Sequence, residues 1–214
     1  MSRKLVLGMS ITLDSFVAGP NGELDWLFAN QGADSTEWIV ENQEGCSLII
    51  MGRKSYEAMA DYWPTSTLPM AHAMNWTPKM IFTRSGSLAK PAKEPLRSAS
   101  DVNGQSKSIP QPDPVIVEMW QNPKFGGKDL GREIEELKSQ DGKPIFALGG
   151  ASFASNLVEH NLVDEYRFIV HPVALGQGIP IFDKLPQPLV LTLIECREFK
   201  AGTIAKVFRP KKGT

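Results

Sequence analysis

Three apolar runs in the sequence each end in a short segment whose residue types can bind an anion. Residues 47–51 lead into Gly52-Arg53-Lys54-Ser55, residues 79–82 into Thr83-Arg84-Ser85, and residues 145–148 into Gly149-Gly150-Ala151-Ser152. The guanidinium and hydroxyl groups of the first two segments are groups that recognise a phosphate monoester. In the third segment, glycine just before a helical pattern leaves backbone N–H groups open to a pyrophosphate.

The paired glycines, Gly149 and Gly150, allow two interpretations. A tight turn from a strand into a helix needs residues that tolerate positive φ, so the pair can serve packing alone. It can also let a ligand approach the backbone. Each of the three segments by itself also fits an ordinary surface turn. Together they indicate a ligand with a pyrophosphate and a separate phosphate monoester, so we expect NADPH as the cofactor.

Alternating strands and helices are expected to position these segments. The hydrophobic patterns predict strands at 5–12, 47–52, 79–84, 114–120, 144–150 and 163–173, a hairpin of 189–199 with 202–210, and helices at 34–45, 53–63, 129–142 and 151–160. This order predicts one α/β domain with a largely parallel sheet and an antiparallel edge. Ligands of such sheets bind at the carboxyl ends of the strands, so the three segments should share one edge.

The composition excludes several classes of function. The chain has 214 residues, 42% apolar residues and a net charge of −1, which indicates no general attraction to nucleic acid or membrane. Cys46 and Cys196 lie far apart and without clustered partners, so we expect no metal site and reduced cysteines in a cytoplasmic protein. Residues 85–114 are rich in Pro, Ser, Lys and Gly and are expected to form a surface loop.

Three stretches of the sequence resemble a known family. "IIMGRKSYEAM" and "LVLGMSITLDSFVAGPNGELDW" resemble dihydrofolate reductase-like motifs, and "FALGGASFASNLVEHNLVDEYRFIVHPVALGQGIPIF" is similar to the C-terminal reductase domain of the RibD family. The resemblance implies a single domain over 1–214, with a loop-rich insertion around 86–128. It also implies a three-layer dihydrofolate reductase-like α/β fold, with a mostly parallel mixed central sheet, a C-terminal antiparallel hairpin, and NADPH as hydride donor.

The resemblance also implies site residues. Those assigned to the 2′-phosphate and the pyrophosphate are Gly52, Arg53, Lys54, Ser55, Thr83, Arg84, Ser85, Gly149, Gly150, Ala151, Ser152 and Phe153. Met9 and Ser10 would flank the nicotinamide, Val17 would lie in a covering loop over 15–26, and Trp26 would lie near the substrate.

The chain departs from its relatives at the positions that would carry chemistry. Asn30 and Gln31 lie where dihydrofolate reductases keep a buried acid, while Asp34 comes later and looks like a helix cap. Gly8 and Leu148 replace a lysine and an acid of the RibD reductases. The sequence therefore does not identify the catalytic residue. Asp14, Asp61 and Asp25 are the candidates, and Asp14 also fits the role of a loop anchor. His171 is expected at a sheet face or a subunit contact.

The resemblance implies a NADPH-dependent oxidoreductase that acts on a small pyrimidine or pterin-type heterocycle, similar to 5-amino-6-(5-phosphoribosylamino)uracil reductase. One alternative is a dihydrofolate reductase. An alternative of another class is a non-catalytic nucleotide-binding protein on the same fold. We expect a homodimer, with no nucleic-acid or membrane partner.

Overall fold

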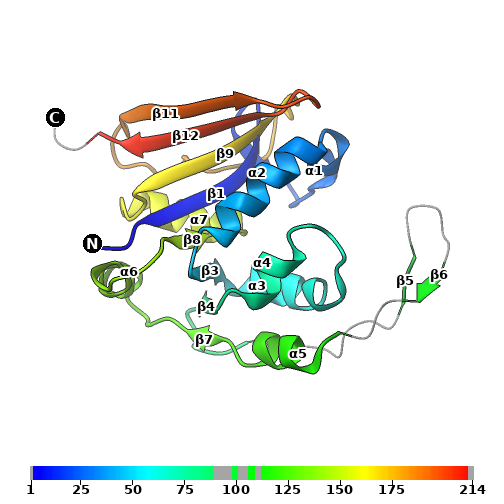
Figure 1. Cartoon of the computed structure of the whole chain (residues 1–214). Coiled ribbons are helices and arrows are strands. Elements are labelled where there is room, and N and C mark those ends of the chain that lie inside the picture. Colours follow the sequence, from blue (N-terminus) through cyan, green and yellow to red (C-terminus); the bar gives the residue numbers. More distant parts are fainter. Residues whose placement is uncertain (1, 89–97, 101–105, 109–111, 212–214) are drawn as a thin grey trace.

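The computed structural model describes residues 2–88, 98–100, 106–108 and 112–211, and within them an eight-stranded sheet forms the centre of the molecule (Figure 1). Its strands, in spatial order, are β11 (Leu191–Glu198), β12 (Ile204–Pro210), β9 (Glu165–His171), β1 (Leu5–Thr12), β8 (Ile145–Ala147), β3 (Leu48–Gly52), β4 (Lys79–Phe82) and β7 (Lys124–Phe125). The pairs from β9 to β7 are parallel, and β12 pairs antiparallel with β9 and β11. The predicted mixed sheet with a C-terminal hairpin is confirmed.

Helices cover both faces of this sheet and complete three layers. They are α1 (Asp25–Ala29), α2 (Ala33–Glu44), α3 (Arg53–Ala60), α4 (Ala71–Trp76), α5 (Pro114–Gln121), α6 (Leu130–Ser139) and α7 (Ala151–Glu159), with a 3₁₀ turn, η1, at Trp63–Thr65. Side chains of α6 and α7 share one hydrophobic core with β1, β3 and β8. On the opposite face, α3, α4 and α5 share a second core with the same strands, and α2 packs on β9 and β12. In the described residues, no helix has the length and apolar character needed to cross a bilayer.

Two small sheets lie outside the central one. The strand β2 (Phe16–Ala18) pairs antiparallel with β10 (Ile179–Pro180), and β5 (Ser98–Ser100) pairs antiparallel with β6 (Ser106–Ser108). The first pair joins the covering loop to the segment after β9. Much of the predicted surface loop over 85–114, and of the insertion around 86–128, lies outside the described residues; the described part contains β5, β6, α5 and β7.

The strand predicted at 114–120 is wrong, because this segment forms helix α5. The Asp113 carboxylate accepts a hydrogen bond of 2.8 Å from the Val115 N–H, and Pro114 occupies the first turn, where its missing N–H costs nothing. Trp120 then buries its ring against α3 and donates its indole N–H to Asn75 Oδ1 at 2.8 Å. The short apolar run is therefore one face of a helix, and β7 forms the sheet edge instead.

Candidate functional site

The three predicted anion-binding segments lie together at one edge of the sheet. The neighbours β8, β3 and β4 are parallel, so their carboxyl ends point the same way. Gly52 pairs with Phe82 across β3 and β4, and Ile50 pairs with Ala147 across β3 and β8. Gly52 and Phe82 are level with each other, and Gly149, two residues after Ala147, follows at about the same level. The three segments therefore leave the sheet at one edge, as the sheet rule predicts.

Two helices begin side by side at this edge. Gly52 precedes α3 and Gly150 precedes α7, and neither helix has a side-chain hydrogen bond at its N-cap. A Cβ atom built on Gly52 would lie 3.1 Å from the Cβ of Phe153 in α7, so the two first turns touch. The helices α5 and α6 have aspartate caps, whereas α1 and α4 also begin without a side-chain cap. Two uncapped helix N-termini in contact present backbone N–H groups and positive dipole ends to one place.

The paired glycines meet the packing requirement considered for them. Gly149 and Gly150 have φ values of 70° and 62°, a region that strains other residues. A Cβ atom at Gly150 would also lie 2.6 Å from the Oγ of Ser55 in α3, and one at Gly149 would lie 3.1 Å from the Cβ of Ser55. Packing against α3 thus requires glycine, and the resulting turn leaves the N-terminus of α7 bare.

Hydrogen bonds between hydroxyl groups shape the second segment, Thr83–Ser85. The Thr83 and Ser85 hydroxyl oxygens lie 3.0 Å apart, and Ser85 Oγ donates to the Ser87 carbonyl oxygen at 3.0 Å. Thr83 is half-buried at the end of β4, whereas Arg84 and Ser85 are exposed. These bonds hold a compact turn at the end of β4, and the neighbouring strand β3 leads directly into α3.

Arg53 carries a partner that the sequence pattern did not show. Its Nη1 donates to both carboxylate oxygens of Glu57, one turn along α3, at 3.0 and 3.1 Å. This pair holds the half-buried guanidinium against its own helix. The neighbouring Lys54 is exposed and Ser55 is half-buried.

Met9 and Ser10 lie on opposite faces of β1. The Met9 side chain packs on the core shared with α6 and α7, so its backbone alone can meet a ligand on the other face. Ser10 points to the face that α2 covers. Gly8 shares that face, and a Cβ atom there would lie 2.2 Å from the Phe146 ring. The space of a lysine at this position is therefore filled by an aromatic ring.

Asp14 anchors the covering loop, as the sequence indicated. Its carboxylate accepts bonds from the Thr12 hydroxyl at 2.6 Å, the Gly176 N–H at 2.8 Å and the Leu175 N–H at 3.0 Å. The Thr12 and Gly176 hydrogen bonds hold the pKa of Asp14 below its ordinary value. The Asp14 hydrogen bonds and the β2–β10 pairing tie the loop over 15–26 to the segment after β9. Val17, in the middle of β2, is buried.

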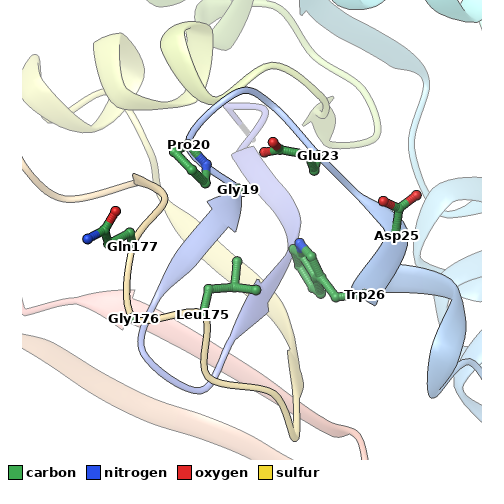
Figure 2. Close-up of a pocket in the computed structure, with 8 residues that line it drawn as sticks. All are labelled: Gly19, Pro20, Glu23, Asp25, Trp26, Leu175, Gly176 and Gln177. Atoms are coloured by element: carbon green, nitrogen blue, oxygen red, sulfur yellow. The ribbon is translucent and has the colours of Figure 1, made fainter.

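A pocket of about 700 Å³ opens between these two tied segments (Figure 2). It is lined by Gly19, Pro20, Glu23, Asp25, Trp26, Leu175, Gly176 and Gln177. The Trp26 side chain is 8% exposed and its ring stands at the pocket wall opposite Pro20 and Gln177. The residue implied to lie near the substrate is thus at the pocket next to the covering loop.

The aspartates considered as catalytic residues or caps differ in their positions and hydrogen bonds. Asp25 lines the pocket, but Figure 2 shows its carboxylate directed away from Trp26. Asp61 ends α3, about 12 Å along the helix axis from Arg53 at 1.5 Å per residue. Asp34 lies in the first turn of α2 and accepts from the backbone N–H groups of Ser35 and Lys200 at 3.0 Å. Asp34 is therefore occupied structurally, as is Asp14. Gly32, rather than Asp34, is the N-cap of α2.

A feature that sequence reasoning missed lies behind Trp26. The Trp26 ring meets the ring of buried His171 edge-on, with centroids 5.1 Å apart. Trp26 Nε1 and His171 Nδ1 are both buried without a hydrogen-bond partner among the described residues. Burial lowers the pKa of His171, so its imidazole is neutral near pH 7. Among the same residues, no group of three or more potential metal-binding side chains is present.

The three-layer fold around this mixed sheet is of the dihydrofolate reductase-like class. The RibD C-terminal domain family matches residues 3–205, so the chain belongs to this family. The chain is 28% identical over 206 residues to YyaP of Bacillus subtilis (strain 168), described as an uncharacterized protein, covering 96% of this chain and 94% of YyaP.

Solved structures share the fold. A candidate riboflavin biosynthesis protein from Shewanella sp. PV-4 matches with a TM-score of 0.68 at 17% identity, covering 99% of this chain and 100% of that chain. The diaminohydroxyphosphoribosylaminopyrimidine deaminase/5-amino-6-(5-phosphoribosylamino)uracil reductase of Thermotoga maritima matches with a TM-score of 0.61 at 16% identity. The match covers 98% of this chain and 57% of the Thermotoga chain.

Proposed function

We propose that this protein is a NADPH-dependent reductase of a small pyrimidine or pterin-type heterocycle, similar to 5-amino-6-(5-phosphoribosylamino)uracil reductase. One observation carries the proposal: the uncapped N-termini of α3 and α7 touch at the sheet edge where the Thr83–Ser85 turn also begins. The membership in the RibD C-terminal domain family supports it. Such an edge suits a ligand with several phosphate groups.

Each part of the edge has a proposed role in cofactor binding. The backbone N–H groups of Ala151 and Ser152 at the start of α7 bind the pyrophosphate, and Ser55 adds a hydroxyl beside them. The N–H of Phe153, which the resemblance also assigned to the pyrophosphate, instead donates to the Gly150 carbonyl oxygen at 3.0 Å. The 2′-phosphate lies between Arg53 and the Thr83–Ser85 turn, with Arg84 at its exposed side. When bound, NADPH supplies the hydride.

The substrate side of the site is the pocket at Trp26. We propose that Ser10 and the backbone of Met9 orient the nicotinamide on β1, and that Val17 and the covering loop exclude water from the reacting groups. The Asp14 bonds to the 175–176 backbone hold this loop in place. Loop closure of this kind protects hydride transfer from solvent.

The experiment is a comparison of NADPH and NADH binding by isothermal titration. We expect a preference for NADPH, and Arg53→Ala should weaken NADPH binding by at least ~1.5 kcal/mol, which is typical of a charged hydrogen bond. Arg132→Ala is the matched control, because Arg132 forms the same kind of i,i+4 pair, with Glu136, on α6. Equal affinity for both nucleotides would refute the 2′-phosphate assignment.

A non-catalytic nucleotide-binding protein is the second candidate. The observation in its favour is that Asp14 and Asp34 are engaged in structural hydrogen bonds, so neither is placed to protonate a substrate. The two candidates share the cofactor edge and differ in turnover. NADPH oxidation, followed at 340 nm with 5-amino-6-(5-phosphoribosylamino)uracil and separately with dihydrofolate, distinguishes a RibD-type reductase, a dihydrofolate reductase and a binding protein.

We also propose that the protein forms a homodimer through β11. This strand ends the sheet, and the exposed fractions of Leu193 and Ile194 are 52% and 47%. An edge strand with exposed apolar residues is a ready site for pairing with a second copy. Light scattering should give twice the monomer mass, and Leu193→Lys with Ile194→Lys should give the monomer. A monomeric wild-type protein would exclude this assembly.

A further inference from the structure

Glu57 places a carboxylate inside the proposed phosphate-binding edge. Both of its oxygens accept from Nη1 of Arg53, at 3.0 and 3.1 Å. Arg53 is the first residue of α3 and Glu57 lies four positions later, so the pair spans the first turn of the helix. The two side chains are 30% and 25% exposed, respectively, so solvent screens this pair less than a fully exposed one. Glu57 therefore adds a fixed negative charge to a site proposed to bind anions.

The pair with Glu57 leaves one hydrogen-bonding edge of the guanidinium for a ligand. The pair uses Nη1, whereas Nε and Nη2 form the opposite edge of the same planar group. A phosphate binds such an edge through two parallel N–H groups. A phosphate at that edge would lie about 5–8 Å from the Glu57 carboxylate, on the other side of the guanidinium. Arg53 can therefore contact both anions at once, and the two anions repel each other across it.

The repulsion acts on one nucleotide and not on the other. The charged side chains of the three anion-binding segments are Arg53, Lys54 and Arg84, and Glu57 is the only acidic residue within α3. NADPH carries a phosphate of about −1.5 to −2 charge at pH 7 where NADH has a hydroxyl group. A carboxylate repels this phosphate but can accept a hydrogen bond from the hydroxyl group. Glu57 therefore acts on the difference between the two affinities.

We propose that Glu57 limits the preference of the site for NADPH over NADH. This inference rests on the proposed function, because it takes Arg53 as a ligand of the 2′-phosphate. The carboxylate has two opposing effects: it orients the Arg53 side chain, and it repels the phosphate. The orientation concerns one of three cations at this edge, whereas the repulsion acts on a dianion across a partly buried group. The net effect of the carboxylate is thus to weaken NADPH binding.

Glu57→Gln separates the two effects, because glutamine keeps an oxygen that accepts from Arg53 and removes the charge. Isothermal titration should show NADPH affinity about three- to tenfold above that of the wild type, and NADH affinity changed less than about twofold. Glu57→Ala also removes the orientation, so it should bind NADPH more weakly than Glu57→Gln does. Its ratio of NADPH to NADH affinity should still exceed that of the wild type. If Glu57→Gln does not fold, Glu57→Ala decides the matter by this ratio.

Glu136→Gln is the matched control, because Glu136 forms the same kind of i,i+4 pair with Arg132 on α6. This variant should bind both nucleotides as the wild type does. Salt gives a second readout, since the screening length falls from about 10 Å at 0.1 M salt to about 3 Å at 1 M. The gain of Glu57→Gln over the wild type should therefore fall below about twofold in about 1 M salt.

Unchanged or lower NADPH affinity in Glu57→Gln, in a protein whose wild type prefers NADPH, would overturn the inference and leave the proposed function standing. So would an equal gain for NADH, or a gain that persists in about 1 M salt. A wild type without a preference for NADPH would refute the 2′-phosphate assignment and this inference with it. Absence of NADPH oxidation with either substrate would reject the reductase, whereas a NADPH preference that rises in Glu57→Gln would still support the role of Glu57.

Discussion

Replacing Gly150 with alanine tests the turn that brings α7 to the cofactor edge. Gly150 has φ of 62° and ψ of 98°, outside the conformations that L residues prefer. The left-handed region costs an L residue about 1–2 kcal/mol. A Cβ atom would also lie 2.6 Å from the Ser55 Oγ, so Ser55 must rotate or α3 must shift. We expect Gly150→Ala to lower the free energy of unfolding by about 2–3 kcal/mol, the backbone cost plus about 1 kcal/mol for the contact.

Two further variants separate these two costs. Gly202→Ala has a similar backbone cost, with φ of 84°, but its Cβ atom would meet Pro172 Cγ at an ordinary 3.7 Å. Ser55→Ala combined with Gly150→Ala removes the hydroxyl and leaves the Ser55 Cβ at 3.8 Å. The free energy of unfolding of Gly202→Ala should therefore be only about 1–2 kcal/mol below that of the wild type. The double variant should be lower than Ser55→Ala by the same amount, about 1–2 kcal/mol.

Urea unfolding gives the stabilities, and NADPH titration gives the functional effect. Gly150→Ala should weaken NADPH binding about tenfold or more, since the added methyl group and the shifted turn move the α7 N–H groups, whereas Gly202→Ala should not. A loss of stability below about 0.5 kcal/mol for Gly150→Ala would refute the backbone argument, which rests on a cost of 1–2 kcal/mol. Wild-type NADPH affinity in that variant would refute the placement of the pyrophosphate.

Three other perturbations have defined outcomes. Glu165 is buried and accepts hydrogen bonds from Arg167 and Arg209. Glu165→Ala should therefore lower the free energy of unfolding, measured in urea, by about 3 kcal/mol. A loss below about 1 kcal/mol would contradict this. Burial lowers the pKa of Lys79 from 10.5 to about 7, so the folded protein binds fewer protons than the unfolded chain between these values. Stability should therefore rise from pH 7 to pH 9 by about 2 kcal/mol more in the wild type than in Lys79→Met, and equal slopes would exclude the shift. Asp14→Asn should speed limited proteolysis within 15–26, because the loop loses its charged acceptor for the 175–176 N–H groups; an unchanged cleavage rate would show that the anchor is unimportant.

The positions of the anion-binding segments were predictable from the sequence. A fully apolar run such as 48–51 indicates a strand buried on both faces of a parallel sheet, and parallel strands end at a common edge. The residue types after each run were readable directly. Their convergence at one edge therefore needed only local patterns and one rule of sheet topology.

Other features were beyond local patterns. The apolar residues of 114–120 fit a strand or one face of a helix equally well, and the Asp113-Pro114 cap was the signal that distinguishes them. The helices α1 and α4 have five and six residues, too few to show a helical period. The pair of Trp26 and His171 left no signal in spacing, because the two residues are far apart in the chain and are joined only by packing of α1 on β9.

By itself, the sequence determined most strands of the central sheet, the longer helices, and the positions of residue types suited to phosphate binding, because these depend on neighbouring residues. The tertiary structure alone decided which polar groups are already occupied. It pairs one guanidinium nitrogen of Arg53, Nη1, with Glu57, fills the space above Gly8 with Phe146, and engages Asp14 with the 175–176 backbone. The partner of a side chain depends on long-range packing. The residue type therefore shows which bonds a side chain can form, and only the fold shows whether its groups are still available to a ligand.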